Sequence, residues 1–234
     1  MAATPSKPRR RNPAVTRLRI LDAAAGVFAQ KGFDGARVDS IAAEAGTNKQ
    51  LLYHHFGNKD ALFTAVLERA YRDIRRQEAA LELDSLGANE AILKLAEFTW
   101  NYYLANPDFI RLLNSENQLE ARHLKASPHT REINEAHIKR MKQLLARGRR
   151  EGSIRRDIDA MQLSVSLAAL GFFYLMNRHT LSTVFRRDLS SRAMLNKRLS
   201  VMKDTIACWI RPRQAGFDSR PLPQPRVAGQ KPQR

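Results

Sequence analysis

The chain has 234 residues and a mass of 26.6 kDa, a length that corresponds to one or two domains with room for a sizeable core. Apolar residues make up 43% and charged residues 27%, as in ordinary globular proteins. The single cysteine, Cys208, excludes an intramolecular disulfide framework and a cysteine-cage zinc site. This composition predicts a cytoplasmic protein without a bound cofactor or metal.

The charge of the chain is unusual. The 40 Lys and Arg residues outnumber the 23 Asp and Glu residues and give a formal net charge of +17. Such an excess favours a polyanionic partner, nucleic acid first and an anionic membrane second. Residues 1–13 and 212–234 are basic, rich in proline and poor in apolar side chains. Both ends are therefore predicted to be disordered, because they cannot bury enough surface to offset the entropy of ordering.

Residues 160–177 form a stretch without charges that must be weighed as a membrane span. Its 18 residues lie at the lower limit for crossing a bilayer, which is about 17–20 residues. The stretch contains Gln162 and Asn177, and charged residues flank it closely. We therefore expect a helix buried in a core or a subunit interface, and no membrane partner.

The middle of the chain predicts an all-α fold, because apolar residues recur at helical spacing and no useful alternating stretch occurs. Helices are expected at 16–31, 38–45, 48–56, 59–82, 88–105, 107–123, 128–151, 157–180 and 191–210. In the first of these, Ile20, Ala24, Val27 and Phe28 fall on one face. Gly32 then supplies a residue able to adopt the left-handed conformation that ends a helix.

Residues 38–56 predict a helix-turn-helix unit. Small alanines precede Gly46 and allow two short helices to cross closely, while Asn48 is placed to cap the second of them. The outer face of that second helix carries Lys49, Gln50, Tyr53 and His54. Lysine reaches guanine acceptors or phosphate, glutamine pairs with adenine, and a tyrosine hydroxyl suits a phosphate oxygen. This face is expected to enter the major groove of double-stranded DNA.

Residues 17–67 resemble the DNA-binding domain of the tetracycline-repressor-like (TetR) family of transcriptional regulators. The matching run is ILDAAAGVFAQKGFDGARVDSIAAEAGTNKQLLYHHFGNKDALF, and it covers about a fifth of the chain. The resemblance implies phosphate contacts for His55 and Lys59. Arg37 and Leu51 stand where the family usually has Ser or Thr; a guanidinium can bind phosphate, and an apolar side chain can contact a thymine methyl. The complete predicted set of DNA contacts is Arg37, Asn48, Lys49, Gln50, Leu51, Tyr53, His54, His55 and Lys59.

The rest of the chain is expected to form a helical body. Aromatic and amide side chains gather in residues 88–180, as in a small-ligand cavity, and the resemblance adds that an effector bound there releases DNA. Its predicted lining is Trp100, Tyr103, Asn117 and Phe172. Small residues recur in the 157–180 helix at three- or four-residue spacing, which predicts a close-packed dimer interface in a four-helix bundle with 191–210. The predicted interface residues are Ser164, Leu167, Ala168 and Gly171.

Chemical sites other than these are not expected. Glu120 and His123 have the i, i+3 spacing of carboxylate-histidine metal sites in bundles, but the second copy that such sites require is missing, so a satisfied polar face is favoured. The sequence has no serine, histidine and acidic residues at the spacing of a known catalytic motif, and no glycine-rich phosphate loop. We therefore expect that the protein is not an enzyme.

The sequence thus predicts a homodimeric repressor that leaves a palindromic operator when a small effector binds. Its domains would be a DNA-binding head at 14–60 and an effector-binding and dimerisation body at 61–211. The alternative is a constitutive DNA-binding protein driven by charge, whose body only dimerises.

Overall fold

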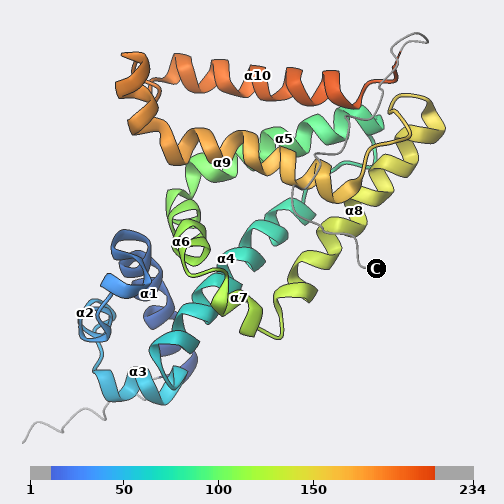
Figure 1. The fold of residues 1–234 in the computed structure, drawn as a ribbon. Helices are drawn as coiled ribbons and strands as arrows, with labels where there is room; N and C mark the ends of the chain where they lie inside the picture. Colours follow the sequence, from blue (N-terminus) through green and yellow to red (C-terminus); the bar gives the residue numbers. More distant parts are fainter. Residues whose placement is uncertain (1–11, 214–234) are drawn as a thin grey trace, which may run out of the picture.

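The computed structural model describes residues 12–213, which form ten α-helices and no strand (Figure 1). The predicted all-α class is therefore confirmed. The predicted tails fall mainly on residues 1–11 and 214–234, which lie outside the described residues. The helices are α1 Pro13–Gly35, α2 Val38–Glu44, α3 Lys49–Phe56, α4 Lys59–Ala79, α5 Ala88–Ala105, α6 Pro107–Gln118, α7 Arg122–Ala126, α8 Thr130–Glu151, α9 Ala160–Phe185 and α10 Arg192–Ile210.

The first three helices and the first half of α4 form a small head. The side chains of Ile20, Phe28, Ile41, Leu52 and Phe63 are fully buried in one apolar cluster. This cluster continues to Leu67 and also takes in Leu112 of α6, so the core of the head extends past residue 60. Helix α4 then runs out of the head and into the body (Figure 1).

Helix α1 is kinked at Gly32, which has φ 67° and ψ 177°. A residue with a Cβ adopts this conformation only with strain, and glycine does not. The kink turns the ring of Phe33 back onto the head, where its centroid lies 6.1 Å from that of Phe28 and 5.2 Å from that of Phe63. The predicted positive φ at Gly32 is confirmed, but ψ is extended and not left-handed helical, and α1 continues to Gly35 instead of ending here. The consequence is a buried aromatic side chain at the edge of the head.

The body consists of α5 to α10 and the second half of α4. Helices α9 and α10 lie side by side across the end farthest from the head, with α5 packed against both (Figure 1). Trp100, Met141, Leu163 and Met202 are buried among these helices. Asp159 caps α9, since its carboxylate accepts a hydrogen bond from the Gln162 amide at 2.9 Å.

The predicted single helix at 107–123 is wrong. Helix α6 ends at Gln118, and Glu120 (φ 54°) and Ala121 (φ 58°) are both left-handed before α7 begins. The left-handed conformation costs about 1–2 kcal/mol for each residue with a Cβ, so this turn stores strain. Neither glycine nor proline marks the break in the sequence, which is why periodicity alone runs through it.

Helix α9 is long and apolar enough to cross a membrane by length and composition. One such helix is weak support for a span, because a core helix of a globular protein passes the same test. Its inner face, with Leu163, Leu167 and Leu175, is buried within the chain. The helix therefore belongs to the body, as the sequence predicts.

Candidate nucleic-acid interface

Helix α3 is held rigidly on the head. Asn48 caps it, because the side-chain oxygen accepts a hydrogen bond from the amide of Leu51 at 2.8 Å. Leu52 and Phe56 are buried and anchor its inner face. The turn before it contains Gly46 with φ 58°, and the helix ends at Gly57 with φ 79°. The predicted helix-turn-helix is thus present, and the Asn48 side chain is occupied as a cap.

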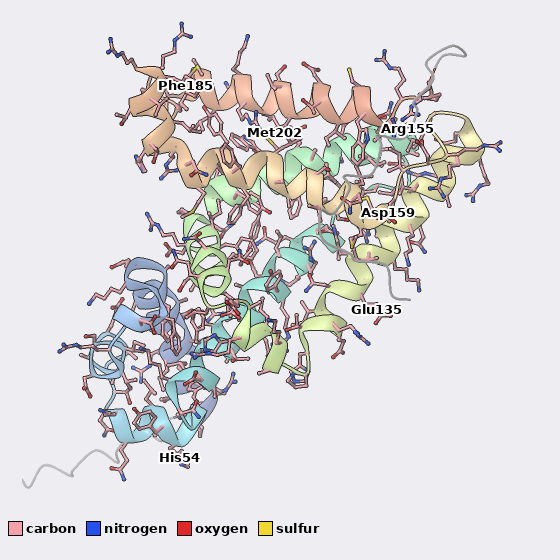
Figure 2. The ribbon with its side chains drawn as sticks, in the orientation of Figure 1. His54, Glu135, Arg155, Asp159, Phe185 and Met202 are labelled. Carbon is pink, nitrogen blue, oxygen red and sulfur yellow. The ribbon has the colours of Figure 1, made fainter. Side chains whose placement is uncertain are left out.

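The outer face of α3 is exposed, with Lys49, Gln50, Tyr53 and His54 all on it. His54 marks the free lower edge of the head in Figure 2. The Lys49 ammonium lies 3.4 Å from a carboxylate oxygen of Asp39 on α2, and 6.0 Å from the centre of the Tyr53 ring. Both charged side chains are largely exposed, so the pair is weak and lysine can exchange it for a phosphate. The structure therefore brings these four side chains together on one open surface.

The remaining predicted DNA contacts flank this face. Arg37 is exposed immediately before α2 and makes no side-chain cap, as expected for a residue that lacks a capping hydroxyl. Leu51 and His55 are half-buried. Lys59 opens α4, where its ammonium lies 4.5 Å from the centre of the Phe33 ring. Lys59 therefore sits at the junction of α1 and α4 as well as near the exposed edge.

Arg17 is a basic residue of this region that the sequence pattern does not single out. It is exposed on α1, and its guanidinium lies 4.8 Å from the centre of the Phe56 ring at the end of α3. Helical spacing places Arg17 on the outer side of α1, but only the crossing of α1 and α3 shows that it stands beside the recognition helix.

Three of the four residues predicted to line the effector cavity lie together in the structure, and the fourth does not. Trp100, Tyr103 and Phe172 belong to one aromatic cluster, with 6.5 Å between the ring centres of Tyr103 and Phe172. Trp100 and Tyr103 are 1% and 5% exposed, so this cluster is closely packed. Burial raises the pKa of the Tyr103 phenol to about 12, and the group stays neutral. Asn117 is exposed on α6 and is not part of the cluster.

A groove opens next to this cluster, between α1, α4 and the turn from α5 to α6. Its volume is about 790 Å³. Leu18, Leu21 and Leu112 give it apolar walls, while Phe109 lines it and packs behind onto Tyr103, with 5.9 Å between ring centres. The groove thus touches both the head and the body.

Two of the four predicted interface residues face inward. Leu167 is 3% exposed. Gly171 is also buried, and a Cβ built on it would lie 3.3 Å from the Tyr103 ring and 3.4 Å from Met202. Leu167 and Gly171 therefore pack within their own chain and cannot line a surface between two chains in this arrangement. Ser164 and Ala168 are half-buried.

The apolar surface of α9 that does face outward consists of other residues. Met161, Val165 and Phe173 are 56%, 55% and 59% exposed, and their spacing by multiples of four places them on one face of the helix. Val184 and Phe185, near the end of α9, are also largely exposed, and Figure 2 shows Phe185 at the turn before α10. Large apolar side chains gathered in this way mark a contact surface.

A buried polar junction connects the head to the body. The hydroxyl of Ser115 on α6 accepts a hydrogen bond from the amide of Phe33 at 3.0 Å. The carboxylate of Glu116, 1% exposed, accepts hydrogen bonds from the amides of His123 and Leu124 at 2.7 and 2.9 Å. Glu116 therefore caps α7 from the preceding helix. A negative charge at a helix N-terminus is favourable because of the helix dipole.

His123 occupies the centre of this junction and is 2% exposed. Its Nδ1 lies 2.7 Å from Glu116, and its Nε2 lies 3.3 Å from Asp60 on α4. Its ring also packs against those of Phe33 and Phe63, with centroids 4.6 and 4.8 Å apart. The histidine thus pairs with Glu116 rather than with Glu120. Among residues 12–213, no cluster of His, Cys, Asp and Glu has the arrangement of a metal site.

A second polar network lies inside the body. His137 on α8 has Nδ1 2.7 Å from Glu78 of α4 and Nε2 3.2 Å from the hydroxyl of Ser164 on α9. The order serine, histidine, glutamate resembles a catalytic triad. However, Ser164 donates its hydroxyl to the Ala160 carbonyl at 2.8 Å and lies within a helix, where the backbone amides are engaged in helical bonds. This network joins three helices and is not arranged for nucleophilic attack.

The geometry defines a class of protein, namely DNA-binding regulators with a helix-turn-helix head on a helical body. Residues 20–66 match the family model described as bacterial regulatory proteins, tetR family, and residues 89–206 match the tetracyclin repressor-like C-terminal domain. The chain is 34% identical over 177 residues to the HTH-type transcriptional repressor NicS of Pseudomonas putida, covering 76% of this chain and 84% of that protein. The chain belongs to the TetR family of transcriptional regulators.

Solved structures have the same fold. A TetR family transcription regulator from Marinobacter aquaeolei superposes with a TM-score of 0.68 at 14% identity, covering 88% of this chain and 100% of the other. The transcriptional regulator FadR from Bacillus subtilis, solved with stearoyl-CoA, gives a TM-score of 0.63 at 17% identity and covers 83% of this chain and 99% of the other. At these identities the likeness concerns the fold.

Proposed function

We propose that the protein is a cytoplasmic repressor that binds a palindromic operator as a homodimer and leaves it when a small molecule binds. The observation that carries the proposal is the open face of α3, where Lys49, Gln50 and Tyr53 project from a helix fixed by its cap and its buried side. A recognition helix of this length reads only a few base pairs. Two copies related by a two-fold axis read a longer palindrome at fixed spacing.

The distribution of charge supports sequence-specific DNA binding over the alternative of DNA binding driven by charge alone. Residues 12–58, which contain α1 to α3, carry five Lys and Arg against four Asp and Glu. Residues 130–213, in the body, carry 18 Lys and Arg against seven Asp and Glu. A protein that bound DNA by charge alone would be expected to concentrate its basic residues on the DNA-binding head. Residues 12–58 are almost neutral, although basic residues precede them in the sequence, so the contacts of α3 depend on individual side chains.

The outward face of α9 supports dimerisation. Met161, Val165 and Phe173 on α9, with Val201 of α10 at 40% exposure, present apolar surface to solvent in a single chain. Pairing α9 and α10 with the same helices of a second copy would bury this surface in a four-helix bundle. The two heads would then project from the same side of the body and could enter successive major grooves.

The groove between α1, α4 and the α5–α6 turn is the proposed effector site. Its apolar and aromatic walls suit a largely apolar or aromatic molecule, and the hydroxyl of Tyr102, which donates to Asp73 at 3.0 Å, offers a polar partner. Tyr103 would support the groove from behind through Phe109, and Trp100 and Phe172 belong to the same apolar cluster. Because the groove contacts both head and body, an occupant that prefers one orientation of the head shifts the population toward it.

Selection of bound sites from a random DNA pool, in the presence of competing non-specific DNA, tests the function. The proposal expects one enriched palindrome. Equal enrichment of unrelated sequences would favour the constitutive charge-driven binder.

Metabolites are then screened for release from the selected site. Leu18→Trp, which narrows the groove, is expected to abolish release. Val15→Trp, on the same helix but outside the groove, serves as the matched control. Release that persists unchanged in Leu18→Trp would place the effector elsewhere.

A further inference from the structure

The head contacts α6 and α7 through polar groups that are buried and directional. Phe33 donates its amide hydrogen to Ser115, and His123 stands between Glu116 and Asp60. Leu112 of α6 also packs in the apolar core of the head. The buried hydrogen bonds add direction to this packing, because each loses its partner when the groups move apart, and an unpaired buried group is strongly unfavourable. These contacts therefore define one position of the head relative to α6 and α7.

The turn between α6 and α7 is held by the same groups. Glu120 and Ala121 adopt the left-handed conformation without being glycine, and such strain persists only where surrounding contacts enforce it. The Glu116 carboxylate supplies that enforcement, because it binds both the amide and the ring of His123 just beyond the turn. One buried carboxylate thus fixes the turn, starts α7 and orients the imidazole.

The His123 imidazole connects the turn between α6 and α7 to the head. Its ring packs on Phe33 of α1 and Phe63 of α4, while Nε2 faces Asp60 in the first turn of α4. That turn follows directly after the recognition helix, since only Gly57 and Asn58 separate α3 from α4. A shift of His123 therefore acts on the support of α3 without touching a residue of its DNA-reading face.

We propose that Ser115, Glu116 and His123 form a latch that sets the position of each head, and thereby the half-site spacing that the dimer accepts. The inference rests on the proposed palindromic function. In this arrangement the latch residues position the recognition helix and make no contact with DNA. Loss of the latch lets each head adopt several positions, so operators with altered spacing become acceptable while the base preference within a half-site is kept.

The test measures affinity for a series of operators that differ only in the number of base pairs between half-sites. Ser115→Ala removes the acceptor of the Phe33 amide. His123→Phe retains an aromatic ring against Phe33 and Phe63 and removes both polar contacts. Gln118→Ala, on the exposed side of the same helix, is the matched control. Thermal unfolding and circular dichroism confirm that each variant is folded.

The wild type and Gln118→Ala are expected to lose about tenfold or more in affinity when the spacing departs from the optimum by one or two base pairs. Ser115→Ala and His123→Phe are expected to reduce that loss at least threefold, with half-site preference unchanged. A folded Ser115→Ala or His123→Phe variant with the wild-type spacing profile would overturn the latch, as would equal weakening at every spacing. If the affinity of the wild type did not depend on half-site spacing, the palindromic function itself would be overturned.

Discussion

His137 Nδ1 lies 2.7 Å from the carboxylate of Glu78, and this contact ties α8 to α4 at the centre of the body. Burial alone would raise the pKa of Glu78, but the hydrogen bond from His137 and the charge of Arg75 outweigh it, so the pKa lies below its ordinary value of 4.5. A carboxyl with a lowered pKa in the folded state stabilises the fold above its unfolded pKa, and the stabilisation is lost as pH falls through the folded value.

The body is therefore expected to lose stability as the pH falls below about 4.5 through the pKa of Glu78 in the folded protein. Glu78→Gln should destabilise the protein at pH 7 by about 3 kcal/mol, because it removes the buried carboxylate that pairs with Arg75. It should also make the loss of stability at acid pH less steep. Urea unfolding between pH 3 and pH 7 measures both effects. Glu135→Gln on the exposed side of α8 is the control, and an acid limb as steep in Glu78→Gln as in the wild type would contradict the assignment.

Substitutions on the outer face of α3 should weaken DNA binding without unfolding the head. Tyr53→Ala and Lys49→Ala should each cost about 1–3 kcal/mol of specific binding, because both side chains are exposed on the proposed reading face. Gln50→Ala should change base preference more than total affinity. Affinity for the selected operator is measured by fluorescence anisotropy, with Lys94→Ala on α5 as a control for loss of a distant charge. Wild-type binding by both Tyr53→Ala and Lys49→Ala would refute the assignment of α3 as the reading helix.

A charge on the outward face of α9 should separate the dimer. Val165 is 55% exposed in the single chain, so Val165→Arg leaves the core of the protomer intact but places an unpaired charge in the proposed interface. Light scattering should report monomers with wild-type helix content. Glu135→Arg, which adds an arginine on α8, should remain dimeric. A dimeric Val165→Arg protein would place the interface on another surface.

The left-handed turn between α6 and α7 should be relieved by glycine. Ala121→Gly removes the Cβ at φ 58°, and the relief should exceed the entropy lost by glycine, for a net gain of roughly 0.5–1 kcal/mol. Ala136→Gly in α8, a right-handed helical position, should instead lower stability by about 1 kcal/mol. The denaturant concentration at the unfolding midpoint should therefore rise for Ala121→Gly and fall for Ala136→Gly. Destabilisation by both would show that Ala121 is not strained.

The sequence by itself determined the features that depend on neighbouring residues. The cap at Asn48, the positive φ of Gly32 and the exposed row on α3 all follow from spacing within one or two turns. Local hydrogen bonds and the helical period are properties of short segments, so they can be derived without knowing how the chain packs.

The tertiary structure decided the features that join distant segments. Helix α9 carries apolar side chains on all of its faces. The helical period therefore did not distinguish its inner face, with Leu167 and Gly171, from its outer face, with Val165 and Phe173. Likewise, Phe33 and Ser115 are 82 residues apart in the chain. Only the packing of α6 against α1 brings them into contact, because a buried polar partner is selected by the geometry of the whole core.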